Sequence, residues 1–204
     1  MKSSIGNSSA RFGFLLTILC FLILPSATTG SCIDDLSTIY FKESFYPDPS
    51  FPRLYIVCPQ HIFDIAKLDF DGNVIEPPFG VREHPPLPLR PNINIRCGDD
   101  GSRANQCWLR GGDLHIDGTK VLGIQDDTLD NVVLEGFTFL GAREHALLAH
   151  KPGSITFRDC EFRDFTKSAA PIMLDYYDAS APSTELVVTF FGCDFRVSDS
   201  ELEY

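Results

Sequence analysis

Several common chemistries leave no signature in this chain of 204 residues. There is no G-x-S-x-G nucleophile turn, no phosphate-binding Walker loop and no glycine-rich dinucleotide motif. The five histidines show no metal-binding spacing. Zinc sites need close cysteine pairs, whereas the two nearest cysteines beyond the amino-terminal region, Cys97 and Cys107, stand ten residues apart. These absences argue against the common serine hydrolases, nucleotide enzymes and zinc proteins.

Basic residues are scarce, since 17 lysines and arginines stand against 28 aspartates and glutamates, a formal net charge of −11. Such a surface repels nucleic acids and anionic membranes. Long apolar runs are scarce as well. Residues 12–24 form the longest, and as a helix they would rise about 20 Å, which is short of the roughly 30 Å hydrocarbon core of a membrane.

Residues 1–30 are typical of a secretory signal peptide. Lys2 and Arg11 precede the apolar run and small residues follow it, so we expect cleavage near Gly30. An uncleaved membrane anchor is the alternative interpretation. Cleavage would remove two basic residues and no acidic one, and would bring the charge from −11 to −13. The predicted product is a secreted, extracellular protein with no membrane span.

Six cysteines remain once Cys20 leaves with the signal. An even number in a secreted chain indicates disulfide bonds. The six candidates are Cys32, Cys58, Cys97, Cys107, Cys160 and Cys193.

One apolar skeleton occurs three times, in residues 131–141, 154–165 and 187–197. Within each copy apolar residues alternate by two, break at Gly or Asp, and alternate by two again. This pattern indicates two short strands that meet at a bend. A further apolar segment fills each interval, at 145–150 and 170–175. Each unit is therefore expected to hold three strands and three turns, a repeat of solenoid length.

We therefore predict an all-β fold, a right-handed parallel β-helix of about five coils in which equivalent residues stack. The expected interior ladders are Phe139, Phe162 and Phe195, and Leu134, Phe157 and Phe190. An antiparallel sandwich is the alternative. The near-identity of "TFRDCEFR" and "TFFGCDFR" at matching phase favours the β-helix.

The remaining segments complete the predicted domain organisation. Residues 31–53 are expected to cap the open end of the solenoid, and residues 54–204 to form the β-helix. Residues 76–92 hold six prolines and are predicted to be an extended loop rather than a strand.

Stacking of the coils also predicts disulfide pairs. Cys160 and Cys193 would share one ladder position, within the Cα spacing that a disulfide requires. Secretion favours the bond, and two stacked thiols are the alternative. Residues 54–58 and 93–97 match in apolar pattern, which would place Cys58 beside Cys97 and leave Cys32 for Cys107. Cys97 with Cys107 is the competing pair, and the sequence leaves both open.

Residues 92–112, 130–142 and 153–165 together resemble the pectin-lyase-like superfamily of right-handed β-helix proteins. More narrowly, they are similar to secreted, mostly uncharacterised β-helix proteins of unicellular algae. The resemblance covers roughly residues 54–197 and implies the fold. The superfamily's hydrolases carry a paired Asp with G-H-G and R-I-K motifs. Here the pair Asp126-Asp127 lies before the strand in a turn and neither motif follows, and the lyase pattern of arginine and calcium ligands is not matched.

Two sets of residues are candidate binding sites. Glu161 and Asp194 would lie on neighbouring coils, where two carboxylates repel or bind a cation such as calcium, and no other cofactor is expected. Neutralisation by Arg163 and Arg196 in a solvated charged face is the simpler interpretation. The second set lies in a loop that lengthens one interval by ten residues, where aromatic and acidic side chains suit a neutral sugar. Its members are Asp175, Tyr176, Tyr177 and Asp178.

These observations favour a secreted protein that binds extracellular glycan or matrix without catalysing a reaction. A divergent polysaccharide lyase or glycoside hydrolase of the pectin-lyase type is the first alternative. The second is a structural or adhesive module that assembles through its coil ends, because few residues follow Val197 to cover the last coil. An acidic tail, a second chain or a natural product longer than Tyr204 would each cover that coil. The ligand, the connectivity and the oligomeric state stay open.

Overall fold

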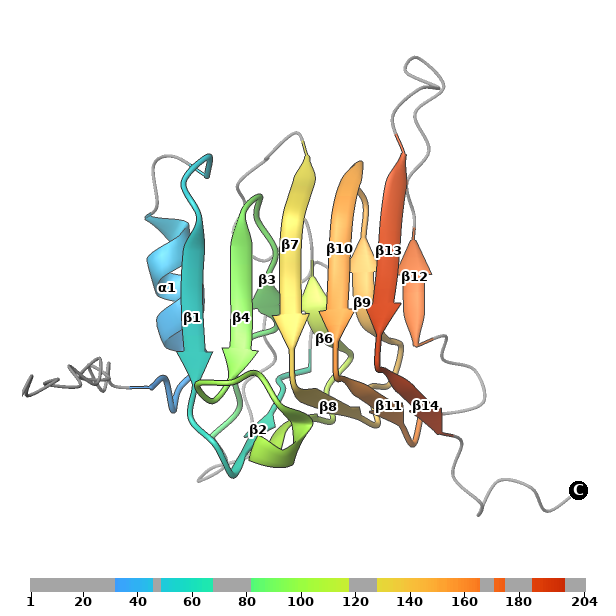
Figure 1. Ribbon diagram of the computed structural model, residues 1–204. Coiled ribbons are helices and arrows are strands. Elements are labelled where there is room, and N and C mark those ends of the chain that lie inside the picture. Colours follow the sequence, from blue (N-terminus) through green and yellow to red (C-terminus); the bar gives the residue numbers. More distant parts are fainter. Residues whose placement is uncertain are drawn as a thin grey trace, which may run out of the picture. The chain divides into compact units, whose positions relative to one another are not determined.

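The computed structural model describes residues 32–45, 49–67, 82–117, 128–165, 171–174 and 185–196. Every described residue belongs to one compact unit, Ser31–Tyr204. That unit consists mainly of parallel β-strands (Figure 1). The predicted all-β class is therefore confirmed. Among the described residues, no helix has both the length and the apolar character that a membrane span requires.

Three parallel sheets make up the unit. The first sheet contains, in spatial order, β1 (Arg53–Val57), β4 (Ile93–Cys97), β7 (Leu129–Glu135), β10 (Gly153–Arg158) and β13 (Leu186–Phe191). The second contains β2 (His61–Asp64), β5 (Cys107–Arg110), β8 (Phe137–Leu140), β11 (Glu161–Arg163) and β14 (Asp194–Arg196). The third contains β3 (Leu87–Pro88), β6 (Leu114–Asp117), β9 (His145–Ala149) and β12 (Ile172–Leu174). The chain visits the three sheets in turn, so each round adds one strand to each sheet.

The registers follow the sequence repeat. Phe162 pairs with Phe139 on one side and with Phe195 on the other. The three rings stack with centroids 4.7 and 4.8 Å apart and planes 13° and 8° from parallel. Phe157 stacks on Phe190 in the same way, at 5.3 Å. The register of both predicted ladders is confirmed. Their first two members, Leu134 with Phe157 and Phe139 with Phe162, are buried in the apolar core, whereas the last members, Phe190 and Phe195, are exposed rather than interior.

The bends between the first and second sheets have one geometry. Gly136, Asp159 and Gly192 all adopt positive φ, at 78°, 47° and 63°. Glycine takes this left-handed conformation freely and aspartate tolerates it better than most residues. The predicted break at Gly or Asp is therefore a turn in which the chain leaves one sheet and enters the next.

Two predictions about the early segments need correction. The proline-rich residues 76–92 were expected to contain no strand, but β3 lies within them and pairs Leu87 with Ile116. Pro88 is compatible with this strand because β3 is the edge of the third sheet, where one face of the backbone needs no donor. Residues 68–81 lie outside the described part of the chain.

The cysteine pairing expected at β1 is also wrong. The disulfides join Cys32 to Cys58 and Cys97 to Cys107. Cys97 pairs in register with Val57 rather than with Cys58, one residue away from the predicted alignment. A shift of one residue turns a side chain to the opposite face of a strand. Cys58 therefore faces away from Cys97, and the competing pair Cys97–Cys107 forms.

The third pair of cysteines lies where the repeat predicted it but is not bonded. Cys160 and Cys193 immediately precede the paired residues Glu161 and Asp194, and both are free thiols. The Cys160 Sγ donates to the Arg158 carbonyl at 3.3 Å. Stacked thiols, the alternative interpretation, describe this pair.

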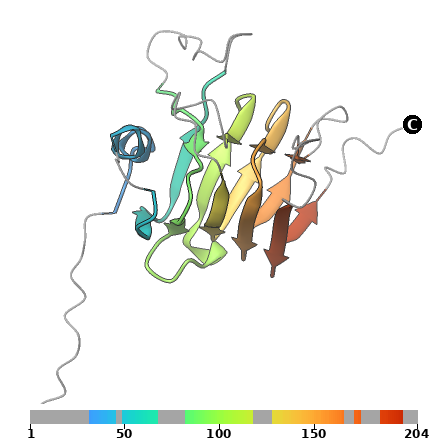
Figure 2. The same ribbon diagram turned by 90° about the horizontal axis from the view of Figure 1, so that it is seen from above.

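Helix α1 (Ser37–Ser44) lies beside β1, at the opposite end of the first sheet from β13 (Figures 1 and 2). It buries Leu36 and Ile39 against the core. The carboxylate of Glu43, which is fully buried, accepts from Arg53 Nε at 2.9 Å and from the Tyr55 hydroxyl at 2.6 Å. These bonds compensate the cost of burying a charge and fix the helix on the first round.

Candidate functional site

The strongest candidate site lies on the outer face of the second sheet. One row of outward side chains runs through Trp108, Thr138, Glu161 and Asp194, which pair in register across β5, β8, β11 and β14. A parallel row two residues further on consists of Arg110, Leu140, Arg163 and Arg196. The predicted positions of Glu161 and Asp194 on neighbouring strands are thereby confirmed. A pocket of about 490 Å³ opens over these rows.

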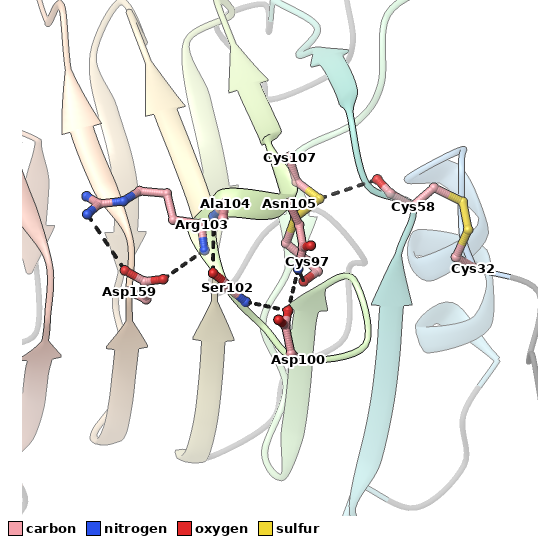
Figure 3. The surroundings of a disulfide bond; sticks show 10 residues. All are labelled: Cys32, Cys58, Cys97, Asp100, Ser102, Arg103, Ala104, Asn105, Cys107 and Asp159. Carbon is pink, nitrogen blue, oxygen red and sulfur yellow. Dashed lines mark hydrogen bonds and ion pairs between the residues drawn. A yellow bond between two sulfur atoms is a disulfide. The ribbon is translucent and has the colours of Figure 1, made fainter. Parts of the chain in front are cut away.

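One wall of the pocket is the loop 98–106, which the Cys97–Cys107 disulfide closes (Figure 3). The loop carries its own hydrogen bonds. Asp100 Oδ1 accepts from the Ser102 amide at 3.0 Å, and Asn105 Nδ2 donates to the Cys97 carbonyl at 2.9 Å. The short 3₁₀ turn η1 (Arg103–Asn105) completes it. A loop restrained in this way presents its side chains in one arrangement.

The loop extends across the later rounds. It packs tightly on the bend at Gly136, where a Cβ atom would lie 2.6 Å from the Gly101 carbonyl oxygen. Its Arg103 amide donates to Asp159 Oδ2 at 2.8 Å, and Arg103 Nη1 donates to Asp194 Oδ2 at 2.7 Å. The Arg103 hydrogen bond holds the pKa of Asp194 below its usual value. A segment from the second round therefore organises carboxylates that lie far later in the sequence.

The floor of the pocket combines an aromatic ring with paired charges. The Arg163 guanidinium carbon lies 4.8 Å from the centre of the Trp108 ring, a cation–π contact. Glu161 is buried, its Oε1 lies 3.1 Å from Arg196 Nε, and its Oε2 accepts from the Thr138 hydroxyl at 3.5 Å. Arginines thus neutralise the carboxylates of the floor and wall, and the pocket presents donors, acceptors and one ring face.

The sequence-predicted site residues have different outcomes. Glu161 and Asp194 lie side by side, but each is paired with an arginine, Arg196 and Arg103 respectively. Within the described ranges, no group of three or more His, Cys, Asp or Glu side chains could hold a metal ion. The candidate glycan ligands Asp175, Tyr176, Tyr177 and Asp178 lie outside the described residues.

Sequence reasoning missed Trp108 and Arg103. The only available signal for Trp108 was its place two residues before Arg110 in a strand, which puts both on one face once the register is known. Arg103 gave no signal, because its contacts depend on how the loop turns.

We expect removal of the Cys97–Cys107 disulfide to disturb the pocket as well as the fold. The chain-entropy relation for a loop of this length gives a loss of about 2.7 kcal/mol for the Cys97→Ser/Cys107→Ser variant, measured by urea unfolding. Without this disulfide, loop 98–106 should also become accessible to proteases. The Cys32→Ser/Cys58→Ser variant is the matched control, since it removes a disulfide outside the pocket. Equal protease resistance of the loop in both variants would contradict the role of Cys97–Cys107.

Comparison with known proteins gives no assignment: no family model matches the chain, and no curated protein and no solved structure matches it.

Proposed function

We propose that the chain is a right-handed parallel β-helix of the pectin-lyase-like type that binds an extracellular glycan on the outer face of its second sheet. The fold is supported by the order in which strands join the sheets, since each strand stacks on its counterpart from the round before. Parallel strands joined by crossovers are right-handed in nearly all proteins. The two disulfides support folding in an oxidising compartment.

The observation that carries the binding proposal is the pocket over Trp108, Glu161 and Arg163. Sugars present flat C–H faces and a rim of hydroxyl groups. An indole ring packs against the C–H face. Carboxylates accept hydrogen bonds from the hydroxyl groups, and guanidinium groups donate hydrogen bonds to them. A pocket of about 490 Å³ has the size of a small-molecule site. The parallel sheet beneath holds these side chains at fixed spacing.

The charge around the pocket favours a neutral glycan. Arg103, Arg163 and Arg196 balance the acids Asp159, Glu161 and Asp194, which leaves no excess of positive charge to attract a polyanion. The net charge of −11 adds a general repulsion toward pectin-like or sulfated chains. Because arginines already engage these acids, binding explains the arrangement better than acid–base catalysis does.

The test is retention of the secreted, disulfide-bonded protein on a panel of neutral and anionic polysaccharides. We expect retention on a neutral glycan, and at least about tenfold weaker binding for Trp108→Ala, which corresponds to about 1.4 kcal/mol. Phe41→Ala is the control, since Phe41 is an exposed aromatic on α1, outside the pocket.

Three other outcomes would overturn the proposal. Unchanged binding by Trp108→Ala would remove the pocket from consideration. Loss of binding only when Tyr176 and Tyr177 are replaced would move the site to that loop. Release of reducing or unsaturated sugar ends would favour the lyase or hydrolase alternative.

A further inference from the structure

The last round of the described chain leaves apolar side chains in solvent. β12, β13 and β14 are each the terminal strand of their sheet, and no described strand pairs with their outer edges. The large apolar side chains exposed there are Leu174 (46%), Val187 (48%), Phe190 (37%), Phe191 (56%) and Phe195 (53%). Phe190 and Phe195 continue ladders whose other members are buried. The apolar core therefore extends to the solvent at this end.

At the opposite end of the first sheet, the outer edge of β1 is covered. Helix α1 buries Leu36 and Ile39 there, and Ile33 bridges to Val57 at the outer edge of β1. In the first sheet, the described residues therefore leave only the end at β13 uncovered. A partner that docks on that end gives a closed complex rather than a filament.

The edge of β13 is suited to pairing with another strand. Leu186–Phe191 contains no charged residue, no proline and no glycine, the features that normally protect an edge. The carbonyls of Glu185 and Phe191 accept from β10, so by the alternation of a strand those of Leu186, Val188 and Phe190 point away from it. The same three side chains face the interior. A strand that pairs with this edge would satisfy the outward-pointing backbone groups and would also extend the apolar core.

We propose that a second copy of this chain docks on this end, with β13 antiparallel to β13 of the partner about a two-fold axis at Val188. The edge is self-complementary in this register. Val188 meets its own counterpart, and Leu186 meets Phe190 of the partner subunit, so all three outward-pointing backbone positions find partners.

Charge favours a second copy as the occupant. Two chains of net charge −11 repel each other over most of their surfaces. The terminal strands are an exception, because β12 and β13 are uncharged and β14 carries one acid and one base, Asp194 and Arg196. Glu185, which immediately precedes β13, is the one unbalanced acid among the described residues of these strands and their adjoining positions, so two copies can approach here with little charge of one sign.

The experiment is sedimentation velocity of the secreted protein over a range of micromolar concentrations. We expect a monomer–dimer equilibrium with no larger species. Val188→Pro removes an amide that points away from β10, so the monomer should fold while the dimer dissociation constant rises at least about tenfold. Leu54→Pro is the matched control, because Leu54 alternates with Arg53, whose amide donates to the Asn92 carbonyl, and its own backbone faces the outer edge of β1. This variant should dimerise like wild type.

A monomer at every concentration, a ladder of larger oligomers, or an unchanged dimer in Val188→Pro would each overturn the proposal. If Val188→Pro fails to fold, Leu186→Lys replaces it, since it would place a charge against Phe190 of the partner subunit and should weaken the dimer equally. Neither residue lines the glycan pocket, so retention on a glycan should be unaffected and the two proposals fail independently.

Discussion

Replacing Phe162 by alanine is expected to lower the free energy of unfolding by about 3–5 kcal/mol, the range for a fully buried phenylalanine. Its side chain is 1% exposed and lies between the rings of Phe139 and Phe195. It also meets Phe157 edge-on at 5.3 Å. Backbone hydrogen bonds hold neighbouring strands about 4.7–4.9 Å apart. The strands therefore cannot move into the space that the missing ring leaves, and a cavity remains.

The same ladder supplies the control for this measurement. Phe195 has the same backbone setting and the same ring stacking on one side, but it is 53% exposed. Phe195→Ala leaves no enclosed cavity and should cost about 1 kcal/mol in urea unfolding, at concentrations where the chain is monomeric. Equal losses for the two variants would mean that the stack does not form the core.

The ladders could be predicted from sequence because the same local pattern occurs three times. Each copy of the repeat carries its own bend residue and its own alternation, so the register of Phe139, Phe162 and Phe195 is fixed by aligning the copies. No information from distant parts of the chain is needed. Periodicity is reliable where a strand is buried on one face and its neighbours repeat that pattern.

The alignment of β1 was predicted wrongly for a physical reason. Leu54 and Ile56 suggest an inward apolar face, but the buried positions are Arg53, Tyr55 and Val57. An arginine can occupy a buried position here only because Glu43 on α1 pairs with it. Apolar periodicity does not register a buried ion pair whose partner comes from another element, and the one-residue error carried over to the cysteine pairing.

The candidate site was predicted in part for related reasons. The rows that contain Glu161, Asp194, Arg163 and Arg196 follow directly from the register. The wall of the pocket does not, because it depends on the path of loop 98–106 through several turns and on the reach of a single long side chain. Contacts of this kind between segments far apart in sequence leave no local pattern.

Acidification is expected to destabilise the protein between pH 6.5 and pH 3 through one buried histidine. His115 is fully buried in β6, its Nε2 lies 3.0 Å from the Gly111 carbonyl, and its ring lies against Phe139. Its Nδ1 finds no hydrogen-bond partner among the described residues. Burial lowers the pKa of His115 to about 3, although the bond to Gly111 acts in the opposite direction.

The sign follows from proton uptake. Below pH 6.5 the unfolded chain binds a proton at this histidine, whereas the folded chain does so only near pH 3. Stability is therefore fully present above pH 6.5 and falls by about 1.4 kcal/mol for each pH unit in between. Burial also lowers the pKa of His84, which adds to the loss just below pH 6.5. Carboxylates with lowered pKa values, such as Asp100 and Asp194, act only below their usual value of 3.8.

His115→Gln tests this assignment, because glutamine can keep a donor near the Gly111 carbonyl but does not titrate. The quantity to compare is the slope of the unfolding free energy between pH 6 and pH 4.5, measured by urea titration at each pH. The slope of the unfolding free energy against pH should be smaller in the variant by about 1.4 kcal/mol per pH unit, whatever its absolute stability. The slope isolates protonation from packing, since a change in packing shifts the whole curve by a constant. A variant with the wild-type slope would show that the pKa of His115 does not differ between the folded and unfolded states, and would contradict this prediction.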